Sequence, residues 1–204
     1  MSVEPEAPEP RWAVPPVGGW TADDLDTLPN LPPHTELIDG SLVFVSPQTL
    51  FHLRTVDFFN WQLQSLAPRE FEIAREFTID IDRSNRPEPD VIVVDGKSIR
   101  EPSQTRFPAE SVQLAIEVVS DESLTRDRET KPVKYARAKI PHFWRVENHD
   151  DRVVVYVFEL EPSTGAYTST GIFHDRMKVS VPFPVDLDLT AISMRRRAAD
   201  PAPE

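Results

Sequence analysis

The sequence predicts an α+β or α/β domain built around a mixed β-sheet that helices flank. Two apolar runs, DVIVVD over 90–95 and VQLAIEVV over 112–119, predict buried strands, because strands covered on both faces are almost continuously apolar. Apolar residues recur at threes and fours over 50–66, which indicates an amphipathic helix. Residues 142–147 and 152–160 predict two strands paired as a hairpin.

A short helix and a hairpin are predicted near the start of the chain. Thr21 is placed to cap a helix that ends near Leu28, with Asp24 three residues after the cap. The segment 36–45, ELIDGSLVFV, predicts a hairpin because Asp-Gly at 39–40 is a preferred pair for a tight primed turn.

The main helix and a long strand follow the hairpin. Ser46-Pro47 predicts the helix start, with the serine as cap and the proline in the first position, and Pro68 ends the helix. A strand with one buried face is predicted over 71–81, because its large apolar residues occupy odd positions. These residues are Phe71, Ile73, Phe77, Ile79 and Ile81.

The second half of the chain alternates strands with loops and one short helix. The polar segment 96–111 contains two prolines and is predicted to be a loop. Pro132 is tolerated only in a first helical turn, which places the start of the next helix near Glu129 or Thr130. Further C-terminal hairpin strands are predicted over 166–173 and 178–181.

The expected domain organisation is one folded unit between two tails. Residues 1–18 are rich in proline and glutamate, and residues 195–204, RRRAADPAPE, are similarly poor in apolar groups, so both predict disordered tails. Residues 19–194 then form a single domain. With 39% apolar and 27% charged residues, the chain has enough apolar surface to bury a core.

Composition excludes several classes of protein. The chain contains no cysteine, which rules out disulfide frameworks, thiolate nucleophiles and cysteine-ligated metals. It lacks both an apolar run long enough for a membrane helix and a signal-peptide pattern, so we expect a cytoplasmic protein with no membrane partner. The net charge of −12 argues against a bulk electrostatic nucleic-acid binder, but leaves room for a carboxylate-rich metal site.

Three charged residues lie in or near the apolar strands, where burying a charge is energetically costly. Asp90 opens one apolar strand, Glu117 lies inside the other, and Lys131 follows fourteen residues later. A buried carboxylate is neutralised, paired or bound to a metal. Two carboxylates at neighbouring strand ends suit Mg²⁺, and a nearby lysine can hold water or steady phosphate charge, as phosphodiester hydrolysis requires. The alternative is a structural Glu117–Lys131 ion pair, with Asp90 capping a turn.

The ordered set of motifs resembles the PD-(D/E)XK nuclease superfamily, and more closely the Uma-two family of restriction-endonuclease-like proteins. The matching stretches are ELIDGSL from Glu36, Ser46-Pro47 with His52, RPEPDV over 86–91, EVVS over 117–120, Arg126-Asp127 leading to Lys131 and Tyr135, and IPHFWRV over 140–146.

The resemblance implies a restriction-endonuclease-like mixed sheet and a centre that uses Mg²⁺ or Mn²⁺. Asp90 and Glu117 would be metal ligands and catalytic residues, and Glu36 a further ligand. In the parent motif the lysine stands two residues after the second acid, where this sequence has Val119. The family resemblance makes Lys131, from the following helix, the catalytic lysine.

Four more residues are candidates for a supporting role or a substrate contact. His52 would touch a phosphate or the metal shell, or else pack. Ser120 would hydrogen-bond Glu117, or else cap the next segment. Asp127 stands four residues before Lys131 and would pair with it on a continuous helix, which Pro132 makes doubtful. Tyr135 would orient Lys131 or pack.

The function expected from these residues is metal-dependent hydrolysis of phosphodiester bonds in nucleic acid, with DNA as the expected substrate. Cutting both strands favours a homodimer. The rival hypothesis is a catalytically weak or inactive nuclease-fold module that binds nucleic acid or protein, which the acidic balance favours. The basic residues available for a local DNA surface are Arg54, Arg83, Arg86, Arg126 and Arg128.

Overall fold

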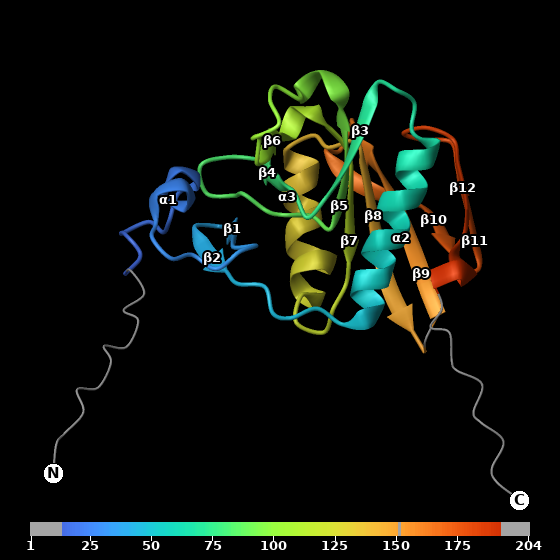
Figure 1. Cartoon of the computed structure of the whole chain (residues 1–204), viewed down its shortest axis with the longest axis horizontal. Helices are drawn as coiled ribbons and strands as arrows, with labels where there is room; N and C mark the ends of the chain where they lie inside the picture. Colours follow the sequence, from blue (N-terminus) through green and yellow to red (C-terminus); the bar gives the residue numbers. More distant parts are fainter. Residues whose placement is uncertain (1–13, 151, 193–204) are drawn as a thin grey trace, which may run out of the picture.

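A mixed β-sheet forms the centre of the computed structural model, which describes residues 14–150 and 152–192. Within these residues the sheet has six strands in the order β10-β9-β8-β7-β5-β3 (Figure 1). The strands are β3 (Phe71–Arg75), β5 (Val91–Asp95), β7 (Val112–Val118), β8 (His142–His149), β9 (Arg152–Glu161) and β10 (Ala166–Phe173). β7 and β8 run parallel and the other neighbours antiparallel, which confirms the predicted mixed sheet.

Each face of the sheet is covered by a different helix. Helix α2 (Leu50–Leu66) covers one face, together with the β11–β12 pair (Arg176–Val179 and Val185–Asp188), and α3 (Lys131–Arg137) covers the other (Figure 1). Successive residues of β5 alternate between the two cores: Val93 packs with the α2 side and Ile92 with the α3 side. Burial of β5 on both faces explains its uninterrupted apolar sequence.

The connection between the parallel strands β7 and β8 carries the second helix. It contains a π-helical turn, η3 (Arg126–Thr130), which leads directly into α3. Pro132 has no N–H to donate to the carbonyl four residues earlier, which favours the wider turn before it. The α-helix therefore begins at Lys131, slightly later than the sequence predicts.

The N-terminal elements pack at one end of the sheet (Figure 1). They are α1 (Ala22–Thr27), with the predicted Thr21 capping box, and the hairpin of β1 (Glu36–Ile38) and β2 (Ser41–Val43). Asp39 and Gly40 have φ of +49° and +73°, as the predicted primed turn requires. The backbones of Leu37 and Arg86 exchange hydrogen bonds of 3.1 and 2.8 Å, which fixes the hairpin to the segment before β5.

The predicted start of the main helix is wrong by three residues. Helix α2 begins at Leu50 and its N-cap is Thr49, whose side chain accepts a hydrogen bond from the backbone N–H of His52. Ser46 and Pro47 belong to the irregular segment that connects β2 to the helix.

The strand predicted over 71–81 is two strands. Glu76 has φ of +49°, which ends β3, and its N–H donates to the carbonyl of Asp90. The following β4 (Thr78–Asp80) pairs in parallel with β6 (Arg106–Pro108), outside the central sheet. The alternation continues through the break because Ile79 is still buried.

The remaining differences lie in short elements. The segment predicted as a loop over 96–111 contains β6 and two 3₁₀ turns, η1 (Gly96–Ser98) and η2 (Ala109–Ser111). The strand predicted over 178–181 is β11, which starts two residues earlier and pairs with the unpredicted β12 before the turn η4 (Leu189–Ile192).

Two predictions fall wholly or largely outside the described residues. The tail expected over 195–204 lies there entirely, as do residues 1–13 of the tail expected over 1–18. Among the described residues, no helix has the length and apolar character needed to cross a membrane.

Candidate active site

Asp90 and Glu117 are brought together by the register of two neighbouring strands. Val91 of β5 lies opposite Ile116 of β7, so the next residue on each side, Asp90 and Glu117, falls at the same end of the pair. The Asp90 Oδ2 accepts a hydrogen bond of 2.6 Å from the backbone N–H of Val118. Glu117 is only 2% exposed, so its charge must be balanced within the protein.

Lys131 supplies that balance from the crossover helix. Its Nζ lies 2.9 Å from Glu36 Oε1, 3.1 Å from Glu117 Oε2 and 3.5 Å from Asp127 Oδ1. Lysine and acids are all buried. Lys131, the lysine that the family resemblance indicates, thus contacts Glu117. It also contacts Asp127, a pairing that Pro132 had made doubtful from the sequence.

Two of the candidates for a supporting role contact Asp90 and Glu117. The Tyr135 hydroxyl donates a hydrogen bond of 2.5 Å to Glu117 Oε1, so this tyrosine contacts the acid rather than Lys131. His52 Nε2 lies 3.0 Å from Asp90 Oδ1. Both side chains are buried, and each fixes one carboxylate oxygen.

Ser120 has the capping role that the sequence left open. Its hydroxyl and that of Ser123 lie 3.0 Å apart, and each accepts a hydrogen bond from the other residue's backbone N–H. Ser120 therefore shapes the turn after β7.

Glu36 joins the cluster from the N-terminal hairpin. Its Oε1 accepts a hydrogen bond of 2.7 Å from the backbone N–H of Glu88. No separate role for Glu88 was predicted from the sequence, although it lies inside the RPEPDV motif; its backbone N–H positions Glu36, while its carboxylate contacts His34 and Thr78.

A cavity of about 50 Å³, hereafter the acidic cavity, opens between these elements. Six acidic residues line it, of which Glu36, Asp90, Glu117 and Asp127 are joined by Glu88 and Glu122, together with Lys131, His52 and Arg126. This volume holds an ion or a few waters, so a nucleotide would have to bind at the opening.

The acidic cavity holds more negative charge than its cations neutralise. Burial raises the pKa of Glu117 well above its usual value, and the neighbouring carboxylates add to the shift against the opposing effect of Lys131. Burial likewise raises the pKa of Asp127.

The cations respond in the opposite sense. Burial alone would lower the pKa of Lys131, but the surrounding carboxylates outweigh it and raise the pKa, so this lysine is charged at neutral pH. Burial also opposes protonation of His52, yet its contact with Asp90 gives a raised pKa.

A divalent cation fits this cavity by charge and donor type. Its acidic side chains outnumber its three cationic ones, from Lys131, His52 and Arg126, and Asp127 Oδ1 is buried without a hydrogen-bond donor among the described residues. Carboxylate oxygens are the ligands that Mg²⁺ and Mn²⁺ prefer. As arranged, however, no three His, Asp or Glu side chains in residues 14–150 and 152–192 form a ready metal cage, and Lys131 holds the central position among the acids.

The arginines are not equally available for nucleic acid. Arg86 is 5% exposed and paired with Asp26 and Asp80, so the expectation that it belongs to a DNA surface is wrong. Arg128 is paired with Glu147.

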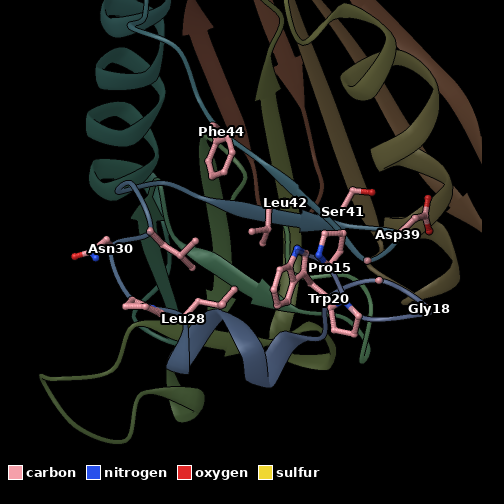
Figure 2. A pocket seen from close by; sticks show the side chains of 14 residues that line it. Pro15, Gly18, Trp20, Leu28, Asn30, Asp39, Ser41, Leu42 and Phe44 are labelled. Carbon is pink, nitrogen blue, oxygen red and sulfur yellow. The ribbon is translucent and has the colours of Figure 1, made fainter. Parts of the chain in front are cut away.

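A larger hollow, of about 740 Å³, is lined by residues of the N-terminal hairpin and of the segment that precedes it. Figure 2 shows its apolar wall, formed by Trp20, Leu28, Leu42 and Phe44, with Asp39 at its edge. The titratable residues of the acidic cavity do not line it.

The arrangement of sheet and helices defines a nuclease-type fold. The solved structure of "a putative nuclease belonging to DUF820 from Anabaena variabilis ATCC 29413" matches with a TM-score of 0.66 and 17% identity, over 84% of this chain and 96% of that chain. The chain belongs to the Uma2 family, described as "Putative restriction endonuclease", whose model matches residues 22–192. The resemblance drawn from the ordered motifs is thereby confirmed.

Two further structures match more weakly. The apo form of NucC from E. coli MS115-1 has a TM-score of 0.32 at 17% identity, over 50% of each chain. The cAAA-bound form of NucC from P. aeruginosa ATCC27853 has a TM-score of 0.31 at 12% identity, over 61% of this chain and 85% of that chain. No curated protein matches this sequence significantly.

Proposed function

We propose that this protein is an endonuclease that hydrolyses DNA phosphodiester bonds with Mg²⁺ or Mn²⁺. The observation that carries the proposal is the contact of Lys131 with Glu117, beside Asp90, at one end of the central sheet. Membership of the Uma2 family supports the same reaction class.

Asp90, Glu117 and Glu36 are the residues that would hold the ion. When bound, a divalent ion supplies Lewis acidity toward a phosphoryl oxygen. Lys131 now contacts Glu36 and Glu117, so the ion would share these carboxylates with the lysine.

The remaining residues act through charge and position. Lys131 is protonated, so its role is to position water by donating hydrogen bonds and to stabilise negative charge that develops on the phosphate, rather than to remove a proton. Tyr135 and His52 keep Glu117 and Asp90 in fixed orientations, which preserves the geometry of the site.

A homodimer is part of the proposal, because two copies related by a two-fold axis can cut both strands of a duplex. Analytical ultracentrifugation at micromolar concentration tests it: a species of twice the monomer mass supports the dimer, and a monomer contradicts it.

The first experiment is calorimetric titration of Mg²⁺ and Mn²⁺ into the wild type and the Glu117→Ala variant. We expect binding by the wild type that disappears in Glu117→Ala and persists in Asp186→Asn, which alters an exposed acid of β12. A plasmid-nicking assay then compares the wild type with Asp90→Asn, which should lose metal-dependent cleavage while keeping its circular dichroism spectrum. Cleavage by Asp90→Asn at the wild-type rate would disprove the site.

A non-catalytic binding module is the alternative, and one observation favours it. The three carboxylates that Lys131 contacts already have a counter-ion, so the cluster also serves as a structural ion-pair network. Under this alternative the wild type neither binds metal nor cuts any DNA, and Glu117→Ala changes only stability.

A further inference from the structure

Arg126 lines the acidic cavity but takes no part in its ion pairs. Its Nε is buried and has no hydrogen-bond partner in the described part of the chain. A buried donor left unsatisfied costs about 1–3 kcal/mol, so such a group in a cavity wall is poised to take a ligand.

The π-helical turn explains why Arg126 reaches this cavity. In a regular α-helix, five residues correspond to about 500°, which would place Arg126 about 140° around the axis from Lys131. In η3 the backbone N–H of Lys131 bonds to the carbonyl of Arg126, five residues earlier. The wider turn brings both side chains to the same cavity, and such turns are frequent at functional sites.

Three carboxylates of the cavity are already engaged with other groups. Glu36 and Glu117 bond to Lys131, and Asp90 bonds to His52 and to the backbone of Val118. Arg126 is therefore not their structural counter-ion. The Arg126 guanidinium is permanently charged and lies beside carboxylates that already bond to other groups, so an anion that enters the cavity can become its partner.

We propose that Arg126 binds a phosphate of the nucleic-acid backbone at the opening of the acidic cavity, next to the bond that is cut. This inference rests on the proposed function. The guanidinium presents several N–H donors in one plane, which suits the oxygens of a phosphodiester and offsets its repulsion by Asp90 and Glu117. Arg126 thus reduces the electrostatic repulsion between the substrate phosphate and the acidic residues at the opening.

The test measures binding separately from cleavage. The Glu117→Gln variant, which is expected not to cut, is titrated with a fluorescein-labelled 20-base-pair duplex at several salt concentrations, and fluorescence anisotropy gives Kd. Arg126→Met is added in this background. Arg128→Met is the matched control, because Arg128 lies two residues away on the same turn but is bonded to Glu147.

We expect Arg126→Met to weaken binding by about tenfold and to reduce the slope of log K against log salt by about 0.9, the value for one phosphate contact. Arg128→Met should leave the slope almost unchanged. Equal affinities and slopes with and without Arg126 would overturn the inference, as would equal losses in both variants, which would indicate general surface charge.

The design separates this inference from the proposed function. If Glu117→Gln with Arg126 intact fails to bind the duplex, while the wild type neither binds nor cuts it, the proposed function fails and the inference falls with it. If that protein binds and only the Arg126 effect is missing, the inference alone is wrong.

Discussion

Lys131 Nζ lies 3.1 Å from Glu117 Oε2, although fourteen residues separate them in sequence. The position two residues after Glu117, where the parent motif has its lysine, is Val119, whose backbone N–H bonds to the carbonyl of Val146 and continues the β7–β8 ladder. The cation instead reaches the acid from the crossover helix. The same juxtaposition of charges thus arises from a tertiary contact rather than from adjacent positions on one strand.

Replacing this lysine should stop catalysis. We expect Lys131→Met to reduce DNA cleavage by about 100-fold or more, because the variant lacks the cation that stabilises charge on the phosphate. Lys134→Met is the control: Lys134 lies on the same helix but pairs with Asp39 outside the acidic cavity. Single-turnover cleavage of a plasmid compares the two, and comparable loss in both would argue against a specific role for Lys131.

Tyr135 should matter through Glu117 rather than through bulk packing. Tyr135→Phe keeps the ring and removes the hydroxyl that donates to Glu117 Oε1. We expect a loss of about 1–2 kcal/mol in the free energy of unfolding, because a buried acceptor loses its donor. The affinity for Mn²⁺ should also fall by about tenfold, as measured by calorimetry. An unchanged Mn²⁺ affinity would limit the hydroxyl to a structural role.

His52 should support Asp90 in the same way. His52→Ala removes the imidazole that lies 3.0 Å from Asp90 Oδ1, and we expect metal-dependent cleavage to fall by about 10–100-fold. His52→Gln, which retains a donor, should recover part of the activity. Equal rates for the two variants would show that the hydrogen bond is not what His52 contributes.

The acid sensitivity of the fold should depend on Glu147 of β8. Burial raises the pKa of this carboxyl, but its contacts with Arg128, His149 and Arg145 outweigh burial and leave the pKa below 4.5. Its stabilisation is therefore complete above pH 4.5 and is lost as the pH falls through the lowered value.

Glu147→Gln should be less stable than the wild type by on the order of 1–3 kcal/mol at pH 7, because Arg128 and Arg145 lose their anionic partner and one of the two carboxylate oxygens becomes an NH₂ donor. The difference should shrink as the pH falls through the lowered pKa of the wild-type carboxyl. Thermal unfolding followed by circular dichroism at a series of pH values from 7 downward measures this, and a difference independent of pH would contradict the assignment.

The turn of the N-terminal hairpin should require Gly40. A Cβ at this position would stand 3.3 Å from Gly19 Cα and from the Trp20 carbonyl oxygen, on a backbone with φ of +73°. We expect Gly40→Ala to lower stability by about 1–2 kcal/mol or more. Gly165→Ala is the control, because Gly165 has φ of +66° with open space around it. A larger fall in Tm for Gly40→Ala isolates the close approach, and equal falls would exclude it.

The sequence was informative where local chemistry decides the structure. Asp39-Gly40 correctly predicted a tight turn. The apolar runs correctly predicted β5 and β7, because a strand that is buried on both faces has apolar residues at almost every position. Asp90 and Glu117 were also evident from the sequence as candidate site residues, because burying a charge within an apolar strand is energetically costly.

The rest depended on contacts between distant segments. The break at Glu76 left no trace, because Ile79 after the break remains buried in the core on the α3 side, although its strand pairs outside the central sheet. The sequence did not distinguish Ser46 from Thr49 as the N-cap of α2, because serine and threonine are both preferred there; the structure has Thr49. The bond from Tyr135 to Glu117 follows from the crossover geometry, which spacing along the chain does not specify.

The π-helical turn also sets the rotational phase of the crossover. Five positions separate Arg126 from Lys131, so deleting one residue between them and closing the turn to α geometry would leave the two side chains about 40° apart about the helix axis, on the same side. Closing the turn to α geometry without a deletion would instead move Arg126 about 140° away from Lys131. Among proteins with this architecture, the length of this short segment and its turn type must therefore change together if both side chains are to face the acidic cavity.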